Sequence, residues 1–426
     1  MKETLNFIDW PTDGLLIEPL LPAIAAQAAE ADASRSVSSE VIALIKDNPV
    51  MGMTASPELG GLDSTVTAVA QELAAAAACC SSTAWCLWNH LCTYHFFCAL
   101  LGPEHSGLLG GITANREWVC FPAGASTRVN GVLQDDQIVL NGSAAFGSGA
   151  RYGEFAGVVF ILRGASPSRS PAEGSFMRGA SPSRSPAEGS LPGVQDARRF
   201  TLVDLRSPGV TVDPTWKAMS LRASATDHLR YEDATVPAER HVPFPDKFRE
   251  VFRAPDFPVI HHRYREDWVA LSDLWLGAMA VGLASAALAE AAQGIRERVA
   301  IAGVKMVERP TIHVNLGQAG TLIKTAGDTV LKACAETDAR IEATATPTAT
   351  DYVRQLGGSV QALSCRDDAM RLILRVLGGN GLREGGTFER RYRDFQAMPL
   401  HINAHRDRVT EQLGRHLLGL PTENTF

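Results

Sequence analysis

The hydrophobic pattern of this chain changes its period near residue 115 and again near residue 240, and no other sequence feature limits the fold as strongly. Residues 13–115 carry apolar side chains at helical spacing, whereas residues 116–240 carry β-branched and aromatic runs bounded by Gly, Asn, Pro and Asp. Beyond a Pro- and Phe-rich linker, helical spacing returns at about 264–300, 312–345, 348–377 and 403–418. We therefore predict an α+β fold with three domains: an N-terminal helical domain (1–115), an antiparallel β-barrel or sandwich (116–240) and a C-terminal four-helix bundle (241–426).

The length and charge of the chain narrow its functional class. It has 426 residues and a formal net charge of −7, with 45% apolar and 20% charged residues. These values are typical of a globular protein with a large core, and they argue against nucleic-acid and anionic-membrane partners. The N-terminus lacks a basic segment followed by an apolar core, and polar residues interrupt the Ala-rich runs at 66–80 and 276–292. We therefore expect a cytoplasmic protein without membrane spans.

The eight cysteines form no CxxC pair. In a chain without an export signal, cysteines are usually small buried hydrophobic residues, with structural disulfides or a metal site as the alternative. We predict neither disulfides nor a metal site.

One segment of the β region cannot contribute to a core. The sequence RGASPSRSPAEGS at 163–175 recurs identically at 178–190, and it is rich in Ser, Pro, Gly and Ala. Such a composition favours a disordered surface loop between strands, and a functional lid is the alternative.

The apolar helix expected at 82–101 carries polar residues that need an explanation. His90 and Tyr94 lie four residues apart, so they share one face of this helix. They are either polar core residues with internal partners or a proton-donating pair that faces a buried ligand.

The segment 377–403 changes from helix to glycine loop to basic helix within a short stretch. Its glycines can end a helix, or they can let backbone amides approach a ligand. Pro399 follows the basic helix, and His401 and Asn403 lie just beyond it.

Four segments together resemble the acyl-CoA dehydrogenase superfamily, in the order and spacing of that family. They are CFPAGAST (120–127), LNGSAAFGSGA (140–150), SLRASATDHLRYEDATVP (220–237) and VLGGNGLREGGTFERRYRD (376–394). The resemblance extends over nearly the whole chain except the duplicated insert. It implies the fold described above and a flavin cofactor.

The resemblance also assigns residues to the flavin. Phe146 would lie against the isoalloxazine, where a large apolar ring excludes water, and the Ser148 hydroxyl would donate to the N5 or O4 edge. The glycine loop would approach a phosphate or adenine of the cofactor of a neighbouring subunit, which implies a homotetramer. The remaining positions that the resemblance assigns to cofactor binding are Pro122, Gly378, Gly379, Gly381 and Arg393.

The carboxylate base of the dehydrogenases has no clear counterpart in this chain. In the commonest branch a Glu lies eight residues after the Asp of the Arg-Asp motif, and counting from Asp394 leads to Ile402. In a second branch the Glu lies early in the long bundle helix, near Ser272, with Asp273 beside it. A divergent FAD-dependent acyl-CoA dehydrogenase that uses Asp273 or another base is therefore the alternative interpretation.

His401, His90 and Tyr94 instead resemble the two-component flavin-dependent monooxygenases of this fold, similar to the dibenzothiophene and p-hydroxyphenylacetate hydroxylases. In that branch a separate reductase supplies FADH2 or FMNH2, and O2 converts it to a C4a-hydroperoxide in a dry pocket. A histidine near C4a can transfer a proton at neutral pH, so His401 is the first catalytic candidate and His90 the second. The further catalytic candidates are Ser148, Tyr94 and Asn403.

The expected function is hydroxylation of a small aromatic, heteroaromatic or N- or S-containing substrate by reduced flavin and O2. The choice between FAD and FMN stays open, although the glycine loop favours FAD. A non-catalytic protein with a flavoenzyme fold is the third interpretation.

Overall fold

The computed structural model describes residues 14–124, 126–163, 197–245, 248–300, 303–402 and 404–422. Apart from Arg163, the duplicated segment 163–190 lies outside these described residues. The N-terminal part contains the helices α2 (Leu21–Ser34), α3 (Ser39–Asp47), α4 (Val66–Cys79), α5 (Ser81–Leu101) and α6 (Ser106–Ala114). Among them α5 is buried along nearly its whole length, as its apolar sequence predicts.

The middle of the chain forms one sheet. Its strands are β1 (Val119–Cys120), β2 (Arg128–Gln134), β3 (Gln137–Gly147), β4 (Phe155–Arg163), β5 (Ala197–Asp204), β6 (Val210–Asp213), β7 (Asp227–Pro237) and β8 (Val242–Pro243). The strand order is β6-β7-β3-β2-β4-β5-β8, and β1 pairs with β4 outside this path. The expectation of an antiparallel sheet is wrong in this respect, because β4 pairs in parallel with both β1 and β2. The sheet is therefore mixed.

The C-terminal part is helical again. It contains α7 (Phe248–Arg253), α8 (Trp268–Arg296), α9 (Pro310–Glu342), α10 (Ala349–Leu377), α11 (Thr387–Ala397) and α12 (Arg406–Leu417). Side chains fix the starts of two long helices. The Asp267 carboxylate accepts from the backbone N–H groups of Val269 and Ala270 at the start of α8, and Thr348 and Asp351 form a capping box at the start of α10.

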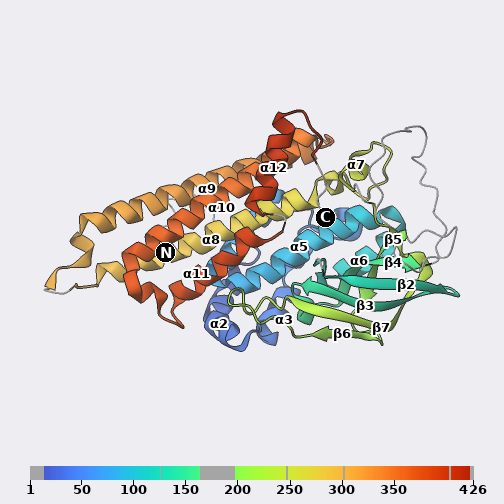
Figure 1. The fold of residues 1–426 in the computed structure, drawn as a ribbon, viewed down its shortest axis with the longest axis horizontal. Coiled ribbons are helices and arrows are strands. Elements are labelled where there is room, and N and C mark those ends of the chain that lie inside the picture. Colours follow the sequence, from blue (N-terminus) through green and yellow to red (C-terminus); the bar gives the residue numbers. More distant parts are fainter. Residues whose placement is uncertain are drawn as a thin grey trace, which may run out of the picture.

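The long helices α8, α9 and α10 pack side by side and extend away from the sheet (Figure 1). The neighbour of α8 on its other side is α4, from the N-terminal part of the chain. This contact is close because Gly282 lies against the backbone of Ala74, where a Cβ atom would come within 1.9 Å of the carbonyl oxygen. A four-helix bundle made by the C-terminal segment alone is therefore not confirmed: helices from both ends of the sequence pack together.

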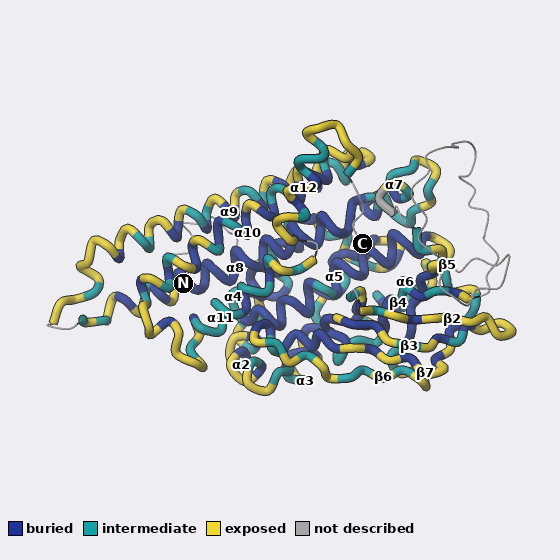
Figure 2. The backbone as a smooth tube through the Cα atoms, in the orientation of Figure 1, coloured by how far each residue is buried: buried dark blue, intermediate teal, exposed yellow. Residues whose placement is uncertain are grey.

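Helix α5 lies between the long helices and the sheet, and burial is continuous through α5 and α8 (Figure 2). An aromatic cluster joins the three layers. The Phe96 ring of α5 lies 4.6 Å from the Trp268 ring of α8, and the Phe97 ring lies 5.4 Å from Phe200 of β5, measured between centroids. Side chains that project from α5 between these contacts are thus held on a rigid element.

Helix α8 is the one helix among the described residues that is long and apolar enough to cross a membrane, but 89% of its apolar window is buried inside the protein. Seven of the eight cysteines are also buried, and none of the eight is disulfide-bonded. These residues fill the core, as their sequence context predicts.

Candidate active site

A cavity of about 570 Å³ lies where α5, the sheet and the segment after α11 meet. This volume is within the range of about 300–1,000 Å³ that is typical of ligand sites. The cavity is lined by Trp85, Trp88, Asn89, Cys92, Thr93, Phe121, Ala123, Gly124, Phe146, Ser148, Trp216, Ala218, Met219, Ser220, Leu221, Thr226, Trp268, Ser272, Gln396, Ala397, Leu400, His401 and Ile402. Four of these residues are tryptophans, which the sequence analysis did not assign to the site.

One face of α5 forms a wall of the cavity. The lining residues Trp85, Trp88, Asn89, Cys92 and Thr93 recur at helical spacing. These five residues lie within the motif WCLWNHLCT, but the helix is apolar on nearly every side, so its sequence does not indicate which face borders a cavity.

The pair predicted on α5 lies one residue away from this face. Each residue along a helix turns the side chain by about 100°, so His90 and Tyr94 are directed away from the cavity that Asn89 and Thr93 line. The pair does share a face, with its ring centroids 6.3 Å apart. The shared face is as predicted, and of the two interpretations the structure supports polar core residues with internal partners rather than a proton-donating pair that faces a ligand.

His90 has a structural environment. The backbone N–H of Val119 donates to its Nδ1 (3.1 Å), so the proton of the neutral ring lies on Nε2, which donates to the carbonyl oxygen of Met51 (3.1 Å). Burial disfavours the imidazolium and lowers the pKa of His90 to about 4. With both nitrogens bonded to backbone, His90 ties α5 to β1 and does not face a ligand.

Tyr94 is also bonded within the protein. Its hydroxyl donates to the carbonyl oxygen of Leu109 (2.9 Å) and lies 2.5 Å from the Thr113 hydroxyl. Both partners belong to α6, so Tyr94 joins α5 to α6 and is not carried further as a catalytic candidate.

His401 borders the cavity between two tryptophans of α5. Its ring lies 5.6 Å from the Trp85 ring and 5.0 Å from the Trp88 ring, with both indoles met edge-on. A short 3-10 turn, Met398–Leu400, ends at His401 and aims the side chain inward. The surrounding protein atoms disfavour the charged form and lower the pKa of His401 to about 4, so the ring is neutral near pH 7.

Ser148 belongs to a row of hydroxyl groups at the end of β3. Its Oγ accepts from Trp85 Nε1 (3.0 Å) and lies 3.0 Å from the Thr226 hydroxyl, which in turn lies 2.7 Å from the Ser224 hydroxyl. If Ser224 donates to Thr226 and Thr226 donates to Ser148, the Ser148 proton is directed to the cavity. The row is therefore suited to donate one hydrogen bond to a bound group.

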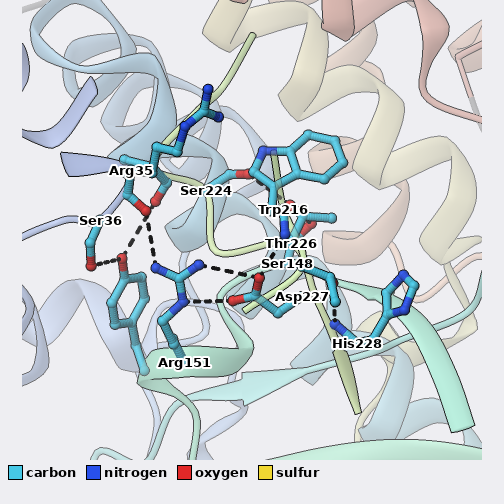
Figure 3. Close-up of polar contacts among 12 residues, drawn as sticks. Arg35, Ser36, Ser148, Arg151, Trp216, Ser224, Thr226, Asp227 and His228 are labelled. Atoms are coloured by element: carbon cyan, nitrogen blue, oxygen red, sulfur yellow. Dashed lines mark hydrogen bonds and ion pairs between the residues drawn. The ribbon is translucent and has the colours of Figure 1, made fainter. Parts of the chain in front are cut away.

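Behind this row, a buried ion pair fixes the start of β7 (Figure 3). The Asp227 carboxylate accepts from Arg151 Nε (2.7 Å) and Nη2 (3.2 Å), and the backbone N–H of Trp216 donates to it (3.1 Å). Arg151 also donates to the carbonyl oxygen of Arg35 (3.0 Å). Thr226 is thereby held next to Ser148, and Trp216 is held at the cavity rim.

Phe146 lines the cavity with 53% of its surface exposed and a backbone φ of 65°. Its ring lies 6.2 Å from Trp216. Gly124 packs against this ring so closely that a Cβ atom would come within 2.5 Å of it, and the Gly124 N–H donates to the carbonyl oxygen of Ala145. Pro122 is buried between two residues that line the cavity and does not line it itself.

Arg393 and Asp394 act on the cavity through the rim segment 216–222. Arg393 donates to the carbonyl oxygen of Met219 (2.5 Å) and pairs with Asp32 (2.8 Å), so its side chain is not directed into the cavity. The buried Asp394 carboxyl accepts from the N–H of Leu221 (2.7 Å), and burial raises its pKa to about 7. Both residues therefore position the rim.

The remaining predicted residues lie elsewhere. Gly378, Gly379 and Gly381 belong to the 3-10 helix Gly378–Leu382 that follows α10, and none of them lines the cavity. A Cβ atom at Gly378 or Gly379 would meet nothing within 4 Å. Asn403 lies outside the described residues.

Neither of the two positions at which the related dehydrogenases carry their catalytic Glu has a carboxylate in this chain. Ile402 lines the cavity with 54% of its surface exposed, so an aliphatic side chain lies where the commonest branch has its Glu. At the second position Ser272 lines the cavity, whereas Asp273 is fully buried and is not among the lining residues. Neither position supplies a carboxylate to a ligand.

The cavity residues fit a flavin. Phe146 offers a half-exposed aromatic face, and Ser148 offers a hydrogen-bond donor at the inner wall. The Gln396 side-chain nitrogen is buried, and no described residue accepts a hydrogen bond from it, so a polar edge of a ligand would satisfy it. Phe146, Ser148 and Gln396 are therefore the residues that could hold the ring system.

The comparisons with known proteins agree with this geometry. Residues 274–406 match the model of the acyl-CoA dehydrogenase C-terminal domain. The chain is 26% identical over 224 residues to the oxygenase component of an FADH2-dependent resorcinol hydroxylase from Rhizobium sp. (strain MTP-10005), a match that covers 50% of this chain and 55% of that protein. It is 22% identical over 421 residues to the oxygenase subunit HsaA of a flavin-dependent monooxygenase from Rhodococcus jostii (strain RHA1), covering 96% of this chain and 99% of that one.

A solved structure extends the likeness to the whole fold. XiaF from Streptomyces sp., in complex with FADH2 and glycerol, superposes with a TM-score of 0.80 at 17% identity, covering 99% of this chain and 97% of that one. The C-terminal segment 274–406 therefore resembles the acyl-CoA dehydrogenases, and the chain as a whole shares the fold of the solved XiaF structure. The two relatives named above are both oxygenase components of flavin-dependent enzymes.

Proposed function

We propose that this protein is the oxygenase component of a two-component flavin-dependent monooxygenase. It would use reduced flavin and O2 to hydroxylate a small aromatic, heteroaromatic or N- or S-containing substrate. The observation that carries the proposal is the pair of neighbours at the cavity wall: Ile402 in place of the dehydrogenase carboxylate, and His401 held between Trp85 and Trp88.

The bound reduced flavin would supply two electrons to O2, so that one oxygen atom enters the product and the other leaves as water. Phe146 and the tryptophans would exclude bulk water from the reacting groups, together with the aliphatic side chains of the wall, because apolar side chains form most of the lining. Ser148, whose Oγ accepts from Trp85 Nε1 and lies 3.0 Å from the Thr226 hydroxyl, would donate to the edge of the flavin and orient it. His401, neutral near pH 7, accepts a proton from the substrate through a ring nitrogen.

We propose FAD as the flavin, because Gly378 and Gly379 of the glycine loop present exposed backbone outside the cavity, suited to the distal half of a larger cofactor, while Gly381 of the same loop is buried. In a homotetramer this loop would serve the cofactor of a neighbouring subunit. The partner is a separate flavin reductase, and the protein would act in the cytoplasm. The relatives that carry this part of the proposal are described as FADH2-dependent or flavin-dependent oxygenase components.

The decisive experiment adds reduced flavin directly, so that no reductase is needed. The protein is titrated anaerobically with FADH2 and with FMNH2, and then mixed with O2 and a panel of phenols, indoles and thioethers. We expect oxygenated product with at least one substrate and tighter binding of FADH2. Bleaching of bound oxidised flavin by an acyl-CoA, with no oxygenated product, would show instead that the protein is a dehydrogenase.

A further inference from the structure

The cavity has no charged wall. Among the described residues that line it, there is no Asp, Glu, Lys or Arg. Its polar groups are hydroxyls, side-chain amides and the ring of His401, which is neutral near pH 7 because its pKa is about 4. A carboxylate, sulfonate or ammonium group would lose its hydration on entry without meeting an opposite charge. The cavity therefore favours an uncharged ligand.

One polar atom of the α5 wall is unsatisfied. The Oδ1 atom of Asn89 is buried, and no described residue donates a hydrogen bond to it. Asn89 lines the cavity one turn before Thr93, next to the Trp88 indole. A buried acceptor without a hydrogen-bond donor is uncommon in folded proteins. We therefore expect a ligand in the cavity to donate a hydrogen bond to this oxygen.

The surroundings of Asn89 are aromatic. The rings of Trp85 and Trp88 lie 4.7 Å apart, and Trp268 and Phe121 line the same cavity. Aromatic walls recognise a flat ring through stacked and edge contacts. The combination of aromatic walls and a single buried acceptor on a rigid helix defines the orientation of a ring that bears one donor.

We propose that Asn89 is the residue that selects and orients the substrate, by accepting a hydrogen bond from a ring O–H or N–H of an uncharged aromatic compound. This inference rests on the proposed function and narrows its substrate class. A sulfur heterocycle or a thioether without such a donor leaves the Asn89 oxygen unsatisfied, and it binds about tenfold more weakly. Phenols and indoles share the required chemistry.

Binding measurements separate this inference from catalysis. Isothermal titration calorimetry on the full chain, with and without oxidised FAD, compares indole with 1-methylindole and with benzothiophene, which has the same shape but no donor. A second arm compares 2-naphthol with its methyl ether. We expect one of the two arms to show a preference of about tenfold for the donor-bearing compound, and that arm identifies N–H or O–H as the recognised group.

The variant Asn89→Leu removes the acceptor at similar volume. We expect it to abolish the preference and to leave the affinity for benzothiophene within about twofold, whereas Asn115→Leu, an exposed Asn at the end of α6, keeps the wild-type preference. If Asn89→Leu does not fold, Asn89→Ala replaces it, with circular dichroism confirming the helical content. Equal affinities for the methylated and donor-bearing compounds in both arms would overturn the inference, as would a preference that persists without Asn89.

The outcomes also distinguish the binding role of Asn89 from the proposed monooxygenase function. A donor preference that depends on Asn89, without product formation from reduced flavin and O2, supports the binding role and contradicts the monooxygenase function. Product formation without any donor preference supports the function and contradicts the role of Asn89.

Discussion

The imidazole of His401 meets the indole of Trp88 edge-on, with 5.0 Å between the ring centroids and 87° between the ring planes. The two residues are far apart in the sequence, and α5 and the turn Met398–Leu400 bring them together at one wall of the cavity. The contact fixes the position of the histidine without charging it, since its pKa is about 4. A neutral base enclosed by indoles suits proton transfer in a site that excludes water.

Replacement of His401 by Ala should uncouple flavin oxidation from hydroxylation. Without the imidazole, proton transfer to and from the substrate slows by about 10²–10⁴-fold, so more of the reducing equivalents leave as hydrogen peroxide. The ratio of product to peroxide per FADH2 measures this effect. His405→Ala, at an exposed residue four positions further on, is the matched control and should keep wild-type coupling. Unchanged coupling in the His401 variant would remove it from the chemistry.

Replacement of Ser148 by Ala should weaken reduced-flavin binding. The variant loses the hydrogen-bond donor directed to the cavity, which costs about 0.5–1.5 kcal/mol of binding free energy, or up to roughly tenfold in Kd. The loss of the acceptor of Trp85 Nε1 affects the stability of the free and the bound protein alike. Thr226→Val should have a smaller effect because Ser148 and its bond to Trp85 remain. Anaerobic titration with FADH2 gives both constants, and Ser34→Ala, at an exposed serine of α2, is the control. An unaltered Kd for Ser148→Ala would exclude its role in holding the flavin.

Asp394 should tolerate an amide but not an apolar side chain. Asp394→Asn keeps an oxygen that accepts from Leu221 N–H, whereas Asp394→Ala leaves this N–H unpaired and should destabilise the protein by about 1–3 kcal/mol. The folded-state pKa of Asp394 is raised to about 7, so its ionisation removes stability as the pH rises through 7. Between the ordinary pKa of 3.8 and 7 the unfolded chain is ionised at this position while the folded chain is not, so Asp394→Asn should gain more stability over wild type at pH 8 than at pH 5. Urea unfolding at both pH values tests this; equal differences at both would refute it.

Two buried histidines, His90 and His95 of α5, should each reduce the stability of the folded protein in mild acid, opposite in sign to the contribution of Asp394. Burial lowers the pKa of His90 to about 4 and of His95 to about 3, below the ordinary value of 6.5. Between 6.5 and these values the unfolded chain binds protons that the folded chain does not, so stability falls as the pH falls through this window. Each histidine contributes a loss on the order of 2 kcal/mol from pH 6.5 to pH 5.

Chemical unfolding between pH 8 and pH 5 measures this loss directly. His90→Gln keeps an amide that can bond to the same backbone groups but cannot titrate, so its stability should depend less steeply on pH. A slope identical to that of wild type would show that His90 does not carry the effect.

Much of the fold was predictable from the sequence, because the change from helical to strand period is a local signal. The apolar run of α5 and the Ala-rich stretch of α8 indicate core helices, and both are buried. The mixed pairing of β4 and the contact of α4 with α8 were not predictable, since they depend on which segments meet across long separations. No local pattern encodes a parallel partner or a neighbour helix from the other end of the chain.

The candidate site divides in the same way. The sequence by itself determined the order of helical and strand segments, and its motifs resemble a flavoenzyme family closely enough to single out Ser148, Ile402 and the neighbouring His401. Only the tertiary structure decided which face of α5 borders the cavity. A helix turns about 100° per residue, and its sequence is apolar on nearly every side, so nothing local distinguishes Asn89 and Thr93 from His90 and Tyr94. The packing of α5 against β1 and α6 fixes that rotation. As a result His90 lies in the core and Asn89 borders the cavity.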